Sequence, residues 1–355
     1  MDMNSREQKK TVFVGVSGGV DSSVSAAVLK DQGYNVVGVF IRTWTPDWID
    51  CTWRDERRDA MRVCAHLEIP FLDCDAEDAY KKGVAGYMIA EYRSGRVPNP
   101  DVMCNREVKF GAFWEFARAR GADFIATGHY ARIDQSPEAS RRLLMGVDSS
   151  KDQSYFLWTL TNDDLLHTLF PVGHLEKKDV RKLAEKYDLP TATKKDSQGV
   201  CFIGEIDMKA FLKHYIESKV GNVINEVGEI IGHHDGAFLF ALGERHGFTI
   251  TKKGSDDSRY FVIAKDIEKN TITVSHTSPH ESGEAKNTYS LVHVNMRTDL
   301  EQAKNYKVQI RYHGEFFDVT ITGNIITFSQ PVLISPGQSI VIYDGDMCLG
   351  GGIVQ

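Results

Sequence analysis

The sequence predicts an α/β fold in which a doubly wound parallel sheet is followed by a small β-rich middle domain and a C-terminal β-barrel. Three observations predict it. β-Branched strands alternate with amphipathic helices up to about residue 210, a Gly-rich turn follows the first strand directly, and short strands separated by turns replace the helices after residue 215. We therefore expect domains at residues 1–215, 216–280 and 281–355.

The apolar segments of the first domain predict its elements in order. Strands are expected at residues 11–16, 35–41, 70–74 and 123–127, and helices at residues 23–32, 54–67, 76–95 and 108–120. Gly33 is placed to end the first helix. The second helix has an apolar face at helical spacing, made of Ala60, Met61, Cys64 and Leu67.

Strands that alternate with helices form parallel β-α-β units with right-handed crossovers. In such sheets the ligand site lies beyond the carboxyl ends of the strands. We expect the loops at Ser17, Cys104 and His129 to meet there. In the C-terminal part, residues 278–286 are a polar linker, and the turns Ser335-Pro336-Gly337 and Asp344-Gly345-Asp346 indicate a β-barrel or sandwich.

Composition limits the possible functions. The 355 residues carry 42 Lys and Arg against 49 Asp and Glu, a net charge of −7, which excludes a strongly basic nucleic-acid coat but not a local basic groove. The polar start has no signal-peptide core, no apolar run approaches the ~18 residues of a membrane span, and six cysteines are too few for a disulfide framework. We expect a cytoplasmic protein with mostly reduced thiols and no membrane partner.

Residues 12–23, VFVGVSGGVDSS, combine a strand, a Gly-rich turn and the start of a helix, which together form an anion site. Gly18 and Gly19 allow phosphate oxygens close to the backbone, and Asp21 either caps the helix or holds a metal. Hydroxyl donors are expected from Ser17, Ser22 and Ser23. The Walker A and dinucleotide patterns are absent. SGGxDS directly after a first strand resembles the loop of N-type ATP pyrophosphatases, which cleave ATP between its α and β phosphates.

Two cysteines lie in unusual surroundings. Cys104 is in a Pro-rich stretch next to Arg106, and Cys201 follows Lys194 and Lys195 in a polar stretch, so cationic neighbours favour a thiolate at both. Cys64, Cys74 and Cys348 are interpreted as buried structural residues, and Cys51 stays open. No Cys pair has zinc-site spacing, and the adjacent His233 and His234 cannot both bind one ion from a regular element, so no metal site is expected.

Several motifs occur in a fixed order: SGGVDSS, GRVPNPDVMCNREVKF, TGHYAR, KDQSYFL, KKDSQGVCFIG and SPGQSIVIYDGDMCLGGGIV. As a set they resemble the tRNA-specific 2-thiouridylase family, bacterial enzymes that thiolate the wobble uridine of certain anticodons. The resemblance extends from about Val12 to the C-terminus and is looser in the middle domain. There Glu244 stands where the family commonly has Gln, and near the C-terminus His313 stands where Arg or Lys is common.

The resemblance implies roles for particular residues. Cys104 would be the nucleophile or resolving thiol, Cys201 would carry a persulfide, and the two could form a disulfide once the sulfur has left. ATP contacts are implied for Gly15, Val16, Ser17, Gly18, Gly19, Val20, Asp21, Ser22, Ile41 and Gly128. Contacts with the target base are implied for Asn99, Pro100 and Asp101. Contacts with tRNA are implied for His129, Lys151, Asp152, Gln153, Arg311, Tyr312 and Gln338.

The implied reaction adenylates the C2 oxygen of uracil with ATP, after which persulfide sulfur replaces that oxygen. Mg²⁺ is expected on the triphosphate, with Asp21 and Asp152 as candidate ligands. The partners implied are tRNA with Lys, Glu or Gln anticodons and a sulfur donor protein. Two alternatives stay open: an ATP pyrophosphatase that acts as an amidotransferase or ligase on a small molecule, and a non-enzymatic adenine-nucleotide-binding RNA module.

Of all the features considered, the surface that would contact RNA is the one that the sequence determines least. A basic rim could comprise Lys109, Arg132, Arg141, Arg142, Lys151, Lys194 and Lys195, although such residues are more often ordinary solvated surface. If RNA is the partner, a positive face is expected around Lys151, Arg132 and Arg311, with few phosphate contacts and a shallow salt dependence. The tryptophans Trp44, Trp48 and Trp53 are either a base-stacking cluster or core residues.

Overall fold

A computed structural model describes residues 9–49, 53–134, 141–195, 208–252, 259–277, 285–301 and 304–355 of the chain. The chain divides into two compact units. The first comprises residues 1–84, 101–204 and 346–349, and the second comprises residues 85–100, 205–345 and 350–355. Within the described ranges, no helix is long and apolar enough to cross a membrane.

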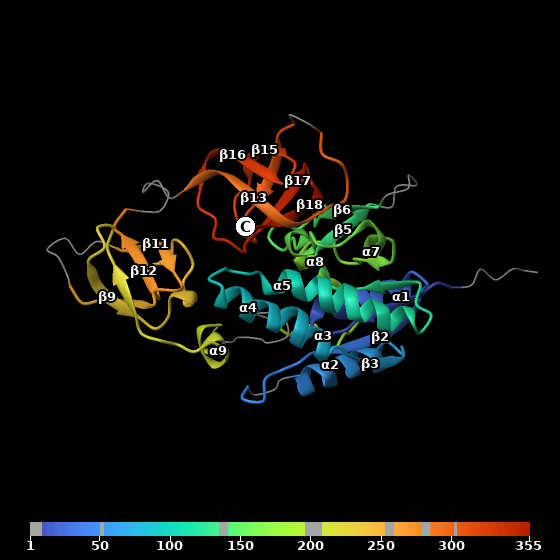
Figure 1. Ribbon diagram of the computed structural model, residues 1–355. Helices are drawn as coiled ribbons and strands as arrows, with labels where there is room; N and C mark the ends of the chain where they lie inside the picture. The colour runs from blue at the N-terminus through green and yellow to red at the C-terminus, as the bar shows by residue number, and fades with distance from the viewer. Residues whose placement is uncertain are drawn as a thin grey trace, which may run out of the picture. The chain divides into compact units, whose positions relative to one another are not determined.

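The first unit is built on a five-stranded sheet in the order β3-β2-β1-β4-β7, and all its strands are parallel. Figure 1 labels β2 and β3 of this sheet. Its strands are β1 (Thr11–Gly15), β2 (Asn35–Arg42), β3 (Phe71–Asp75), β4 (Phe124–Ala126) and β7 (Thr168–Leu169). The central strands β1 and β2 are almost continuously apolar and buried, as is typical of strands covered on both faces. The predicted doubly wound sheet is confirmed.

The strand order reverses at β1. The chain moves outward from β1 through β2 to β3 and then returns to β4 on the other side of β1. Such a reversal opens a crevice between the loops that follow the two central strands. The two loops approach closely, because a Cβ atom added at Gly128 after β4 would lie 2.7 Å from the backbone nitrogen of Ser22.

The helices over residues 20–186 are α1 (Val20–Asp31), α2 (Trp53–His66), α3 (Glu77–Tyr80), η1 (Lys81–Gly86), α4 (Tyr87–Arg93), α5 (Pro100–Cys104), η2 (Asn105–Ala112), α6 (Phe113–Arg118), η3 (Ser154–Leu157), α7 (Asn162–Leu166) and α8 (Lys177–Lys186). Both η1 and η2 are π-helical, which a search for a 3.6-residue period does not reveal. Gly33 follows the first helix with a φ of +89°, as expected for a residue that ends a helix.

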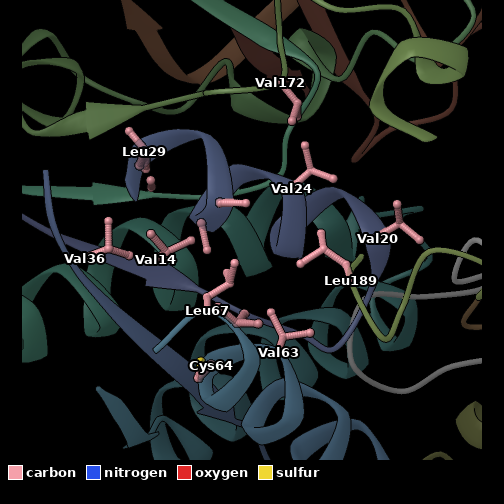
Figure 2. Close-up of a cluster of buried hydrophobic side chains, with 14 of the residues drawn as sticks. Val14, Val20, Val24, Leu29, Val36, Val63, Cys64, Leu67, Val172 and Leu189 are labelled. Carbon is pink, nitrogen blue, oxygen red and sulfur yellow. The ribbon is translucent and has the colours of Figure 1, made fainter. Parts of the chain in front are cut away.

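The core of the first unit contains buried side chains from β1, β2, α1, α2 and α8 (Figure 2). In α2 the buried stripe is Ala60, Val63, Cys64 and Leu67. The prediction that Met61 belongs to this stripe is wrong, because its side chain is 42% exposed. Val63 takes that place, since spacings of three and four residues from Ala60 define the face.

The prediction that Cys104 lies in a loop is also wrong. α5 begins at Pro100 and continues directly into η2, so Cys104 is the last residue of a short helix. Proline is compatible with the first helical position, where its missing N–H is not needed. The Pro-rich stretch therefore marks the start of a helix here.

Three strands of the first unit were not predicted, namely the edge strand β7 of the parallel sheet and two further strands. β5 (Ala131–Asp134) and β6 (Arg142–Met145) form an antiparallel pair. Leu144 of β6 also pairs with Met347, near the C-terminus of the chain. The hairpin therefore joins the segment after β4 to residues 346–349 of the same unit.

The middle part of the second unit contains a five-stranded sheet in the order β10-β9-β8-β12-β11. Its elements are α9 (Met208–Tyr215), β8 (Gly221–Ile224), β9 (Ile230–His234), η4 (Ala237–Leu239), β10 (Phe248–Ile250), β11 (Phe261–Asp266) and β12 (Thr271–Ser275). Neighbouring strands are antiparallel except β8 and β12, which are parallel. The predicted small β-rich middle domain is confirmed.

The last strands form a six-stranded barrel. They are β13 (Lys286–Met296), β14 (Tyr306–Gln309), β15 (Phe317–Thr322), β16 (Ile325–Val332), β17 (Ser339–Asp344) and β18 (Met347–Val354). Their order is β13-β16-β15-β14-β17-β18, and pairing of β13 with β18 closes the barrel. Gly337 and Gly345, at φ +91° and +59°, lie in the two predicted turns. Most of the predicted linker, residues 278–284, lies outside the described residues.

Candidate active site at the carboxyl end of the parallel sheet

The loop between β1 and α1 forms a backbone anion site. Gly18 has a φ of +72°, and a Cβ atom there would lie 2.6 Å from the carbonyl oxygen of Glu56, so only glycine fits. No side chain caps α1 at Gly19, which leaves the N–H groups of its first turn for an anion. The Val20–Ser22 turn thus has backbone N–H groups that no side chain caps, which supports the predicted anion site.

The serines of this loop play different parts. Ser22 and Ser23 are buried, and their hydroxyls donate to the carbonyl oxygen of Gly19 at 3.2 and 2.7 Å. They stabilise the turn in this structure, and donation from Ser22 and Ser23 to phosphate stays a prediction. Ser17 is exposed, with its Oγ 3.3 Å from that of Ser22, and is the hydroxyl at the surface of the loop.

Asp21 does not cap α1, and two other side chains of the protein already bind its carboxylate. The Nζ atom of Lys177 lies 2.7 and 2.8 Å from its two carboxylate oxygens, and the hydroxyl of Tyr130 donates to Oδ1 at 2.7 Å. The cap position belongs to Gly19 instead. The carboxylate is therefore held by a cation and a hydroxyl of the protein.

Apolar side chains and small residues pack around the loop between β1 and α1. A Cβ atom at Gly15 would touch Ile41 at 3.4 Å, and the buried Val16 donates its N–H to Val39 at 2.8 Å. The close approach of Gly128 to Ser22 completes the contact between the loops after β1 and β4. The structure thus brings Gly15, Val16, Ile41 and Gly128 together around one loop.

His129 follows Gly128 and is only 6% exposed. Its Nδ1 lies 2.7 Å from the hydroxyl oxygen of Thr127, and its Nε2 lies 3.4 Å from the Nζ of Lys109. Burial and the neighbouring ammonium lower the pKa of His129 well below its usual value. The imidazole is therefore neutral at pH 7. Because it is buried, little of the ring is accessible to an RNA ligand.

The segment around Asp152 is tied down by its own side chain. The carboxylate, 5% exposed, accepts from the backbone N–H groups of Gly146 and Ser154 at 2.7 and 3.2 Å and from the Ser154 hydroxyl at 2.8 Å. This satisfied carboxylate is a poor candidate for Mg²⁺. Gln153 exchanges two hydrogen bonds with the backbone of Tyr130, at 2.8 and 3.0 Å, so the segment is joined to the residue that contacts Asp21.

Cys104 is fully buried at the end of α5. The nearby Arg106 is exposed, and its guanidinium pairs with Glu107 at 2.7 Å. Asn105, 2% exposed, donates to the carbonyl oxygens of Asp101 at 3.1 Å and Phe156 at 3.3 Å. These bonds fix the end of the Cys104 helix against the Asp152 segment.

Cys201 lies outside the described residues, so the Cys104–Cys201 pair stays a prediction. The chain is described as far as Lys195. Arg181 donates to the carbonyl oxygens of Ala192 and Lys194 at 3.0 and 2.6 Å, and the Lys194 ammonium pairs with Asp59 at 2.8 Å. Asp59 packs against Gly18, so the segment that leads to Cys201 is anchored beside the anion loop. Six residues reach at most ~20 Å from Lys195.

The structural interpretation of the other described cysteines is confirmed. Burial raises the pKa of the Cys64 thiol to about 12 and that of Cys74 to about 11, and Cys348 is 1% exposed. Cys51 lies outside the described residues. Where side chains are described, no group of three His, Cys, Asp or Glu could hold a metal ion, and His233 is exposed while His234 is buried.

Comparisons with known proteins match the whole architecture. Residues 10–205 match the family described as "tRNA methyl transferase HUP domain", residues 209–276 its PRC-barrel domain, and residues 285–354 the "Aminomethyltransferase beta-barrel domain". The tRNA-specific 2-thiouridylase MnmA of Lysinibacillus sphaericus is 42% identical over 97% of this chain and 94% of its own length. The protein of the same name from Bacillus subtilis is 41% identical over 99% and 97%.

The chain belongs to the tRNA-specific 2-thiouridylase family. The fold and the resemblance stated from sequence motifs are thereby confirmed. Among solved structures, a 4-thiouridine synthetase–RNA complex with bound ATP is similar at 16% identity, a TM-score of 0.35, and 58% and 50% coverage of the two chains. That similarity is too low to carry an argument about the site.

The predicted RNA-contacting residues of the second unit are exposed to solvent to different degrees. Arg311 is exposed, and Tyr312 stacks on His313 with ring centroids 3.9 Å apart. The Gln338 side chain accepts from the backbone of Ser335 at 3.0 Å, within the predicted turn. Asn99 and Pro100 are half-buried, as is Asp101 in the first unit.

Most of the predicted basic rim is already paired with other groups. Arg132 pairs with Asp346 at 2.6 Å, Arg142 pairs with Asp134, and Arg141 donates to the carbonyl oxygen of Leu165 at 3.1 Å. The half-buried Lys151 and the exposed Lys195 belong to the same predicted rim. These pairings favour a sparse RNA-binding surface over a continuous basic stripe.

The other two open features of the sequence also have structural explanations. Glu244 pairs with Lys209 at 2.6 Å, so its charge is compensated within the middle domain. Trp48 is 42% exposed, Trp44 lies near the Lys81 ammonium, and Trp53 packs partly against the core. The three tryptophans thus have three different surroundings.

Three residues of the site were missed by sequence reasoning: Tyr130, Lys177 and Asn105. Tyr130 and Asn105 lie inside motifs that were noted, TGHYAR and PNPDVMCN, and could have been found by asking what each polar side chain in a motif does. Lys177 lies in a helix with several other lysines, and nothing in the sequence distinguishes it.

Proposed function

We propose that this chain catalyses ATP-dependent 2-thiolation of the wobble uridine of tRNA. The observation that carries the proposal is the anion loop after β1, uncapped at Gly19 and located where the strand order reverses, in a chain 41–42% identical to 2-thiouridylases over nearly its full length. The loop binds the phosphates of ATP through its backbone. The chain has three domains, at residues 1–215, 216–280 and 281–355.

The reaction divides between the loop and two thiols. The C2 oxygen of uracil attacks the α-phosphorus of ATP, pyrophosphate leaves, and the adenylated oxygen becomes a leaving group. The terminal sulfur of a Cys201 persulfide attacks C2, directly or after its release as sulfide, and AMP leaves. Cys104 attacks the Cys201 sulfur, which frees the transferred sulfur and leaves a Cys104–Cys201 disulfide.

The burial of Cys104 bears on this scheme. Its thiol is fully buried in this structure, which would shield the exchange with Cys201 from bulk water. Asn99, Pro100 and Asp101 lie three to five residues before Cys104. They would meet the target base, which must leave its stack to reach the site. tRNA is held further by the segment 151–153 and by Arg311, Tyr312 and Gln338.

Mg²⁺ would neutralise the triphosphate when bound. Mg²⁺ in nucleotide sites rests mainly on phosphate oxygens and water with one or two carboxylates, which agrees with the lack of an acidic cluster among the described residues. A partner protein supplies the sulfur, the substrates are tRNAs with Lys, Glu or Gln anticodons, and the protein acts in the cytoplasm.

The proposal is tested by incubating the purified chain with ATP, Mg²⁺, a persulfide donor and unmodified tRNA. Nucleoside mass spectrometry should detect 2-thiouridine, with one AMP and one pyrophosphate formed for each. Turnover of ATP on a small amide or acid without RNA would favour a ligase instead. ATP binding without any turnover would favour an RNA-binding module.

A further inference from the structure

Asp21 presents a problem of charge. It is the second residue of α1, within the loop proposed to hold the triphosphate of ATP. A carboxylate there stabilises the helix through its dipole, yet it repels the phosphates that the same backbone attracts. The protein must therefore compensate this charge for an anion to bind well.

Lys177 supplies the compensation. Its Nζ contacts both oxygens of the Asp21 carboxylate, at 2.7 and 2.8 Å, and the two side chains are 15% and 30% exposed. Partial burial makes such a pair stronger than a surface ion pair, because water screens it less. The loop is thus close to neutral in this structure.

Lys177 is held in place independently of Asp21. It is the first residue of α8, and its backbone N–H donates to the Asp148 carboxylate at 2.9 Å. Helix α8 also packs along α1. The Lys177 side chain therefore extends to the loop from a helix whose backbone is fixed by these contacts.

We propose that Lys177 is a positioning residue for ATP, which neutralises Asp21 so that the loop accepts a triphosphate. The inference rests on the proposed function, because it takes ATP as the ligand of this loop. Removal of the ammonium leaves an uncompensated carboxylate beside the phosphates. Removal of both charges restores a neutral loop.

This predicts a specific pattern in the dissociation constant of MgATP, measured by calorimetry without tRNA. Lys177→Met should weaken binding at least tenfold, and the double variant Lys177→Met/Asp21→Asn should bind MgATP at least threefold more tightly than Lys177→Met. The loss in Lys177→Met should shrink as salt is raised. In the thiolation assay the KM for ATP should rise more than kcat falls.

Lys178→Met is the matched control, because Lys178 lies on the same helix, is exposed, and pairs with Glu176. It should leave ATP binding unchanged. If Lys177→Met does not fold, Lys177→Gln takes its place, with the same expected loss and the same recovery when it is combined with Asp21→Asn. Equal affinity of the Lys177 variant and the unaltered chain, or a double variant no better than the Lys177 variant alone, would overturn the inference. Failure of the unaltered chain to bind ATP would instead refute the proposed function.

Discussion

The side-chain amide of Asn105 bonds to the carbonyl oxygen of Phe156, 51 residues further along the chain, at 3.3 Å. The same amide holds the carbonyl oxygen of Asp101 at 3.1 Å. Because Asn105 follows Cys104 directly and Phe156 belongs to the segment that carries Asp152, one buried amide joins the thiol helix to a segment proposed to contact tRNA.

Asn105→Asp should disrupt this junction. The substitution keeps the shape but replaces both amide donors by a carboxylate near two carbonyl oxygens, so we expect a loss of about 1–3 kcal/mol in the free energy of unfolding. Thiolation below the unfolding transition should fall more than tenfold. Asn324→Asp, which removes a 3.1 Å bond to the Leu291 carbonyl in the barrel, is the control. Equal loss of activity in both variants would contradict a local role for Asn105.

Tyr130→Phe should impair the use of ATP. The hydroxyl donates to Asp21, while the Tyr130 backbone is bonded to Gln153, so this residue joins the 151–153 segment to the anion loop. We expect a several-fold higher KM for ATP in the presence of tRNA. Tyr187→Phe is a matched control, because its hydroxyl donates to Asp31 at the far end of α1, also at 2.7 Å. An unchanged KM in Tyr130→Phe would refute the link.

Gly128→Ala should separate the loops after β1 and β4. The new Cβ would lie 2.7 Å from the backbone nitrogen of Ser22, a contact that requires the backbone to move. We expect a large rise in the KM for ATP. Gly33→Ala, where φ is +89° and nothing lies within 4 Å, should cost about 1 kcal/mol of stability and leave that KM unchanged. Similar KM values in the two variants would contradict this prediction.

His129 should make stability depend on pH. Its pKa in the folded protein is well below 6.5, whereas the unfolded chain titrates near about 6.5. The unfolded state therefore takes up a proton first as the pH falls, so stability is full above about pH 6.5 and declines below it. Urea unfolding of His129→Gln between pH 7.5 and 5 should show a shallower decline. His313→Gln removes an exposed imidazole and should keep the original slope; the same slope in His129→Gln would disprove the assignment.

The features that the sequence predicts well depend on residues that lie close together along the chain. The β1–loop–α1 unit, the order of strands and helices, and the turns at Gly337 and Gly345 depend on neighbouring residues alone. Lys177 and Tyr130 could not be predicted as partners of Asp21, because they lie 156 and 109 residues away and meet it only through packing.

The errors have physical causes as well. The proline stretch before Cys104 suggested a loop because proline usually interrupts helices, whereas Pro100 occupies the position where a helix tolerates it. The hydroxyls of Ser22 and Ser23 donate to the carbonyl oxygen of Gly19 in this structure, and their predicted donation to phosphate stays a prediction. Arg132 and Arg142 suggested an RNA-binding rim, and acidic neighbours bind both.

The central claim is that sulfur reaches the base through Cys201 in an ATP-dependent transfer. Its most direct test is mass spectrometry of nucleosides from tRNA treated with ATP, Mg²⁺, a persulfide donor and either the unaltered chain, Cys201→Ser, or Cys348→Ser. Cys348 is the control, since its buried Sγ lies 3.9 Å from the Ser154 carbonyl oxygen, to which a serine hydroxyl can also donate. We expect 2-thiouridine with the unaltered chain and with Cys348→Ser, and none with Cys201→Ser, although that variant still binds tRNA. Full thiolation by Cys201→Ser would contradict it.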